Sequence, residues 1–145
     1  MMTAAMQAQA QQQIADNVQK YSLMLCEALK QNYADYCIKN YGKSDADSLT
    51  DYVIESGRKY HKVIYIDSSG GRSVHAFVDK KTGEVYKSAS WKSPAKGVRY
   101  DLRIIEQREW LLQHADWAGG YLYARWCIYK NKSFLKWLTL LTTSQ

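Results

Sequence analysis

The sequence predicts an α+β fold: a long N-terminal helix packed on a small antiparallel β-meander, followed by a second helix and a C-terminal β-prone or helical extension. Two observations predict the helix and the sheet. Apolar residues recur at steps of three and four from Ile14 to Cys37, and three β-branched or aromatic segments follow within residues 60–87. The length of 145 residues and an apolar share of 46% suit one globular domain.

The first predicted element is a helix over residues 14–41. Its apolar residues, among them Val18 and Leu25, fall on one helix face, and Gly42 is well suited to the position just after a helix. Residues 1–13 are rich in Ala, Gln and Met, which are good helix formers. They are therefore expected to be a low-complexity tail or an extension of this helix.

A short helix is predicted next, starting at Ser48 or Thr50 as its N-cap and ending near Glu55. Three strands of an antiparallel meander follow at residues 60–66, 73–78 and 84–87. The last two are separated by an Asp-x-x-Thr-Gly turn in which Gly83 can adopt a positive φ. The middle of the chain is thus expected to form the sheet.

The remainder of the chain is predicted to contain a basic loop, a short strand and a second helix. The loop covers residues 88–97, the strand residues 98–100 and the helix residues 101–113, with Asp101 as N-cap. The helix is expected to place Leu102, Ile105, Leu111 and Leu112 toward the core, and Gly119-Gly120 to interrupt the chain after it. Residues 121–129 are β-prone, and residues 134–142 suit either a strand or a short helix.

These elements divide the chain into three parts: residues 1–13 as the tail or helix extension, residues 14–125 as a single α+β domain, and residues 126–145 as an apolar C-terminal extension. The three cysteines, Cys26, Cys37 and Cys127, show no disulfide or zinc spacing and are interpreted as reduced thiols. Neither a signal peptide nor a membrane-spanning apolar run is recognisable. A cytoplasmic location without membrane partners is expected.

Positive charge is concentrated in the predicted sheet and the loop that follows it. Residues 57–100 carry a net charge of +7, within a chain whose net charge is +6. The same segment holds six aromatic residues. Cations can neutralise phosphates, and aromatic faces can stack on bases, so this composition favours contact with single-stranded DNA or RNA.

The residues expected to contact nucleic acid lie in the hairpin and the 88–99 loop. They are Lys62, Arg72, Tyr86, Lys87, Trp91, Lys92, Lys96 and Arg99. Two other interpretations remain open: a basic face that is merely solvated, because strand-edge lysines often serve solubility, and a surface that binds an acidic protein.

No catalytic or metal-binding motif is recognisable, so the chain is predicted to be neither an enzyme nor a cofactor-binding protein. His61 and His75 fall on neighbouring predicted strands, but neither is followed by the residues of a two-histidine phosphoesterase motif. Glu84 and Lys87 are separated by one residue too many for the Glu-x-Lys strand of a nuclease, which puts the two side chains on opposite strand faces.

A pattern of residues within 72–100, in which a hairpin is followed by Trp91, a Pro-Ala-Lys triplet and Arg99, resembles small uncharacterised proteins of tailed bacteriophages, as does the segment 116–125. The resemblance implies a viral origin and a setting in the host cytoplasm or the virion. It implies no catalytic residues.

Three functions follow as hypotheses. The first is a basic module that binds single-stranded nucleic acid. The second is a virion structural or assembly component that forms homo-oligomers or binds other virion proteins. The third is a modulator of a host enzyme.

Overall fold

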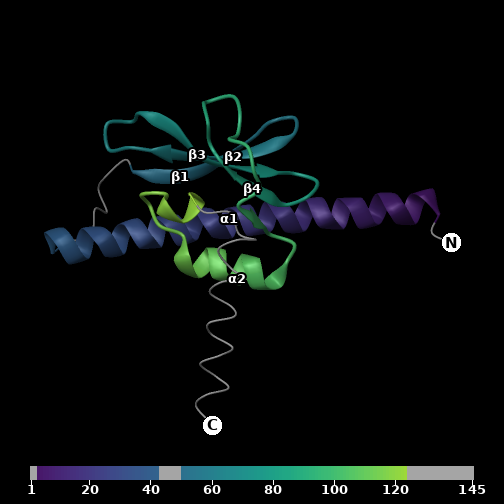
Figure 1. Ribbon diagram of the computed structural model, residues 1–145, viewed down its shortest axis with the longest axis horizontal. Helices are drawn as coiled ribbons and strands as arrows, with labels where there is room; N and C mark the ends of the chain where they lie inside the picture. The colour runs from purple at the N-terminus through teal and green to yellow at the C-terminus, as the bar shows by residue number, and fades with distance from the viewer. Residues whose placement is uncertain (1–2, 43–49, 124–145) are drawn as a thin grey trace, which may run out of the picture.

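The computed structural model describes residues 3–42 and 50–123 of the chain (Figure 1). The elements are α1 (Ala4–Tyr41), β1 (Asp51–Ser56), β2 (Tyr60–Ile66), β3 (Arg72–Asp79), β4 (Glu84–Lys87), β5 (Tyr100–Asp101), α2 (Ile105–His114) and a 3-10 helix, η1 (Gly120–Leu122). The five strands form one antiparallel sheet in sequence order. The predicted α+β class and the central meander are therefore confirmed.

Helix α1 begins earlier than the apolar pattern alone predicts. Its N-cap is Thr3, whose hydroxyl accepts a hydrogen bond from the backbone N–H of Met6 at 3.2 Å. It ends as predicted at Gly42, which has a φ of +73° and donates its N–H to the carbonyl of Ile38 at 2.9 Å. Residues 4–13 therefore extend the helix, as their helix propensity allows.

Strand β1 replaces the short helix that was predicted up to Glu55. Asp51–Ser56 pairs with β2 along its whole length, with Tyr52 opposite Tyr65 and Ile54 opposite Val63. A ladder with this partner strand stabilises the extended backbone more than local capping stabilises a helix, because it also buries Tyr52 completely.

The predicted second helix is confirmed, but its start lies later. Asp101 belongs to β5, and its carboxylate accepts from the N–H of Arg103 at 2.9 Å, which forms a turn before α2 rather than its N-cap. Leu102 and Leu111 are fully buried and Leu112 packs against the core as expected. The prediction for Ile105 is wrong: it lies in the first turn of α2 with 60% of its surface exposed.

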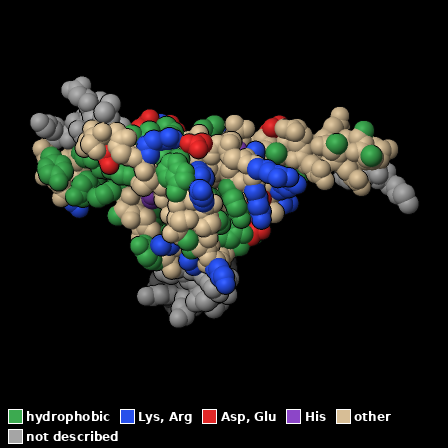
Figure 2. Space-filling model, turned by 90° about the horizontal axis from the view of Figure 1, so that it is seen from above, with side chains coloured by type: hydrophobic (Ala, Val, Ile, Leu, Met, Phe, Trp, Pro, Cys, Tyr) green, Lys and Arg blue, Asp and Glu red, His purple; other side chains and the backbone are tan. Residues whose placement is uncertain are grey.

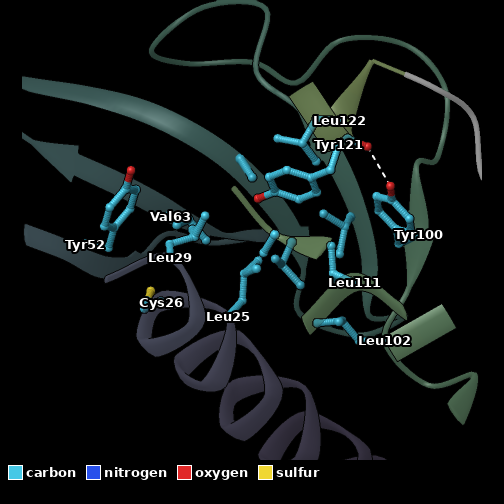
Figure 3. Close-up of a cluster of buried hydrophobic side chains, with 14 of the residues drawn as sticks. Leu25, Cys26, Leu29, Tyr52, Val63, Tyr100, Leu102, Leu111, Tyr121 and Leu122 are labelled. Atoms are coloured by element: carbon cyan, nitrogen blue, oxygen red, sulfur yellow. Dashed lines mark hydrogen bonds between the residues drawn. The ribbon is translucent and has the colours of Figure 1, made fainter. Parts of the chain in front are cut away.

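The two helices and the sheet enclose one hydrophobic core. Helix α1 runs along the sheet, and α2 lies beside α1 (Figure 1). Leu25 from α1, Val63 from β2 and Leu111 from α2 meet in this core (Figure 3). The hydroxyl of Tyr100 donates to the backbone carbonyl of Tyr121 at 2.5 Å, which fixes η1 over the cluster (Figure 3).

The segment after α2 differs from the predicted strand at its start. Gly119 has a φ of +82°, and Tyr121 and Leu122 lie in the 3-10 helix with both side chains buried. Residues 124–145 lie outside the described part of the chain, and with them the predicted extension 126–145, the segment 134–142 and Cys127. Cys26 and Cys37 are buried free thiols, as predicted.

Candidate nucleic-acid interface

The alternation of side chains along the strands divides the aromatic residues of the basic segment between two faces of the sheet. Cross-strand pairs join Lys62 to Phe77 and Phe77 to Tyr86, so these three share one face. Phe77 is fully buried but does not belong to the core under the helices, whereas Tyr65 and Tyr100 pack in or against that core. We call the face that carries Lys62, Phe77 and Tyr86 the outer face.

Trp91 is presented by a short turn, residues 88–94, which we call the 88–94 turn. Ser88 and Pro94 form an isolated β-bridge, and the N–H of Ser90 donates to the carbonyl of Ser93 at 3.1 Å. The hydroxyl of Ser88 donates to the carbonyl of Val74 at 2.8 Å, which ties the turn to β3. The indole of Trp91 is 41% exposed. The turn thus holds a large aromatic side chain partly open to solvent.

Two cations from neighbouring strands lie against this indole. The Nζ atom of Lys62 on β2 is 4.9 Å from the centroid of the Trp91 ring, and the Cζ atom of Arg72 on β3 is 5.7 Å from it. Lys62 also lies 6.0 Å from the Phe77 ring. Both distances to Trp91 fall within the range of cation–π attraction. Three of the predicted contact residues, far apart in the sequence, are therefore brought together.

Two charged residues of this region were not predicted as part of it. Glu55 on β1 forms an ion pair with Arg72, with 2.8 Å between Oε2 and Nη2. Lys59 lies over the Tyr60 ring at 5.3 Å. Glu55 was missed because its segment was predicted to be a helix, whereas the Lys59-Tyr60 dipeptide beside a predicted strand was a visible signal. Part of the positive charge of Arg72 is neutralised by Glu55.

Tyr86 lies on the outer face but is a poor candidate for stacking on a base. Its hydroxyl donates to Oε2 of Glu84 at 3.1 Å, and its ring packs edge-on against Tyr60 at 6.1 Å. Desolvation, together with the hydrogen bond to Glu84, raises the pKa of Tyr86 to about 12. Tyr86 is therefore packed among the other aromatic side chains of the outer face, beside Tyr60.

The structure does not gather all eight predicted residues. Lys87 pairs with Ala76 on the helix-covered side of the sheet, and its Nζ lies 4.8 Å from the Tyr123 ring, so the structure does not bring it together with Lys62. Lys92 and Lys96 are exposed on the loop after β4, and Arg99 is partly buried. On the face seen in Figure 2, Lys and Arg side chains lie in several groups separated by other side chains.

The two histidines of the sheet do not form a pair. His61 lies opposite Val78 and is 2.8 Å from the hydroxyl of Ser56, whereas His75 lies at the register shift between β2 and β3. Burial, with a smaller contribution from Lys80, lowers the pKa of His61. Within residues 3–42 and 50–123, no group of three His, Cys, Asp or Glu side chains is placed to hold a metal ion.

No helix in the described part of the chain is both long enough and apolar enough to span a membrane. No curated protein and no solved structure shows significant similarity to the chain. A family model described as a family of unknown function, DUF7717, matches residues 2–124. Since this match covers most of the sequence and all the described elements, the chain belongs to the DUF7717 family.

Proposed function

We propose that the protein binds single-stranded DNA or RNA on its outer face, with Trp91 as the stacking residue. The observation that carries the proposal is the placement of a partly exposed indole close to cations from two adjacent strands, Lys62 and Arg72. An aromatic ring accepts any base on its face, and nearby cations neutralise the phosphates on either side of that base.

The order of the 88–94 turn supports this proposal. Hydrogen bonds within the turn and from Ser88 to Val74 fix the backbone that carries Trp91, so binding a base would require little additional ordering. Lys92 and Lys96 extend the positive charge along the same loop. Neither forms an ion pair with another described residue, so both ammonium groups are available to phosphates.

Charge also sets the orientation of the proposed ligand. Glu55 and Glu84 lie on the outer face, on β1 and β4 respectively, and would repel a phosphate chain that ran across the strands. A path from Lys62 past Trp91 to the 92–96 segment leads away from Glu84, whereas Glu55 is the cross-strand neighbour of Lys62 and is paired with Arg72. The proposed site is therefore the Trp91 end of the outer face, without Lys87.

The test is titration of a fluorescent single-stranded oligonucleotide with the full chain, at about 50 and about 200 mM salt. We expect an affinity that falls with rising salt, is about tenfold lower in Trp91→Ala, and is largely retained in Trp91→Phe. Lys39→Gln, which removes an exposed cation from the last turn of α1, is the matched control. Binding that is equal in wild type and Trp91→Ala, or insensitive to salt, would refute the proposal.

A second candidate function is assembly into oligomers or onto virion proteins. It is favoured by the N-terminal part of α1, which projects beyond the rest of the molecule (Figures 1 and 2). Residues 4–9 of this arm are exposed, and Met6 exposes 51% of its surface. Light scattering at high protein concentration tests self-association. A molecular mass that stays that of the monomer would refute the homo-oligomer.

The modulation of a host enzyme is a third proposal, and it uses the same basic surface to bind an acidic patch. Capture of host proteins with and without nuclease treatment separates it from nucleic-acid binding. The bacteriophage origin and the location in the host cytoplasm or the virion also stay predictions.

A further inference from the structure

A recess lies on the helix-covered side of the sheet, between β3, β4 and the segment that leads into η1. Its volume is about 250 Å³. Residues that line it include Tyr65, Ser73, His75, Lys87, Trp117 and Tyr123. It lies outside the Trp91 region, since none of Lys62, Arg72 and Trp91 lines it.

The walls of this recess combine aromatic rings with one cation. Tyr65, Trp117 and Tyr123 supply rings from three separate segments, and the Nζ of Lys87 lies 4.8 Å from the centroid of the Tyr123 ring. Ser73 and Ser88 add hydroxyl groups, of which that of Ser88 is bonded to the carbonyl of Val74. Flat rings with a cation at one side suit a planar ligand that carries a negative charge.

His75 provides a polar group within the recess that is neutral at pH 7. Its Nε2 lies 2.7 Å from the hydroxyl of Tyr121, and its ring is stacked on the Tyr121 ring with centroids 5.6 Å apart. Burial lowers the pKa of His75 to about 4, opposed by the nearby charge of Asp116. His75 makes no other hydrogen bond to a described residue, so Nδ1 is left for a ligand.

The size of the recess limits the ligand to a small molecule. Sites for drug-sized ligands usually enclose about 300–1,000 Å³, and this recess is slightly smaller. One heterocyclic base fits that scale, and its edge offers hydrogen-bonding groups to Nδ1 of His75 and to the hydroxyl of Ser73. A phosphate attached through a sugar would reach toward Lys87.

We propose that this recess binds a nucleobase, stacked among Tyr65, Trp117 and Tyr123, with its attached phosphate on Lys87. The ligand has two sources of the same chemistry: a free nucleoside monophosphate, or one residue of a single strand. The second source rests on the proposed function, whereas the first does not.

The chain connects this recess to the outer face at two points. Arg72, which lies against Trp91, is followed by Ser73 in the recess, and Lys87 and Ser88 lead directly into the 88–94 turn. A strand bound at Trp91 thus has a short route around the end of β3 and β4 into the recess.

The experiment titrates the full chain with adenosine and uridine monophosphates, with adenosine, and with the labelled oligonucleotide, following Trp indole signals by NMR. We expect saturable binding of a monophosphate that is at least about tenfold weaker in Lys87→Met. Adenosine should bind more weakly than its monophosphate and be insensitive to Lys87→Met. Tyr123→Ala, at a side chain that is 70% exposed, provides a second variant with little risk to folding.

The variant Trp91→Ala separates this proposal from the proposed function, because it should leave monophosphate binding unchanged. The recess proposal is overturned if no nucleotide binds at millimolar concentration, or if Lys87→Met and Tyr123→Ala bind as wild type does, even when the oligonucleotide binds through Trp91. If the monophosphate binds through Lys87 and the oligonucleotide does not bind, the recess proposal stands with the free nucleotide as its ligand.

Discussion

The ammonium nitrogen of Lys62 lies 4.9 Å from the centroid of the Trp91 ring, which links the middle of β2 to the tip of the 88–94 turn. Cation–π attraction of this kind stabilises an exposed contact by about 0.5–1 kcal/mol. It holds the indole over the outer face and keeps a cation beside it. In the proposed binding mode, a base would stack on Trp91 and its phosphate would lie next to Lys62.

The first prediction concerns the salt dependence of oligonucleotide binding. Replacement of Lys62 by Gln removes one cation from the proposed phosphate path, so the slope of log affinity against log salt should become shallower by about 0.7. Fluorescence anisotropy at several salt concentrations measures the slope. The control Lys39→Gln removes the same charge from α1 and should leave the slope unchanged. Identical slopes for wild type and Lys62→Gln would contradict the proposed interface.

A second prediction concerns the ion pair of Glu55 with Arg72. Glu55→Gln removes a negative charge from the outer face and releases the guanidinium, so oligonucleotide affinity should rise by about twofold to fivefold, the range of an exposed ion pair. Glu27→Gln is a matched control, because Glu27 forms an exposed ion pair with Lys30 on α1 at 3.2 Å. The prediction fails if the two variants tighten binding equally, or if neither does.

The sequence predicted the fold where a pattern was long or chemically distinct. The three- and four-residue spacing in α1 and the β-branched segments of β2 and β3 left little ambiguity. Strand β1 was missed because Asp51–Ser56 is short and follows residues that resemble an N-cap. Its alternation of Tyr52 and Ile54 with Asp51, Val53 and Glu55 is a strand pattern, but only pairing with β2 gives that pattern an advantage.

The candidate site was predictable by residue type but not by placement. Tyr86 and Lys87 are adjacent in a strand, so alternation alone puts them on opposite faces, and a single patch containing both was inconsistent with the predicted strand. The proximity of Trp91 to Lys62 depends on how residues 88–94 fold back across the sheet. That is a long-range contact, and no local sequence pattern encodes it.

A third prediction concerns Gly83 in the turn between β3 and β4. Its φ is +76°, and a Cβ atom there would lie 3.3 Å from Cγ2 of Val18 and 3.2 Å from Cγ of Arg103. Gly83→Ala should therefore lower the free energy of unfolding by about 1–3 kcal/mol, measured by urea unfolding. Gly70 has a φ of +88°, and a Cβ atom there would have no atom within 4 Å. Gly70→Ala therefore introduces backbone strain alone and should lower the free energy of unfolding by less. Equal losses would show that contact with α1 is unimportant.

The last prediction is an acid sensitivity that arises at His75. Burial lowers its pKa in the folded protein to about 4, whereas the unfolded chain has the ordinary value of about 6.5. Between these values the unfolded state binds a proton that the folded state does not, so the free energy of unfolding falls as the pH falls from about 6.5 to about 4. The loss attributable to His75 should reach up to about 3 kcal/mol.

Urea unfolding of wild type and His75→Phe across this pH range measures that loss as a difference in slope. The variant loses the hydrogen bond to the Tyr121 hydroxyl and is expected to be less stable at pH 7. Its free energy of unfolding should nevertheless fall less on acidification. Other titrating groups, including His61, act in both proteins and cancel in the comparison. Parallel pH profiles for wild type and His75→Phe would show that the pKa of His75 is the same in the folded and unfolded states, which would contradict the prediction.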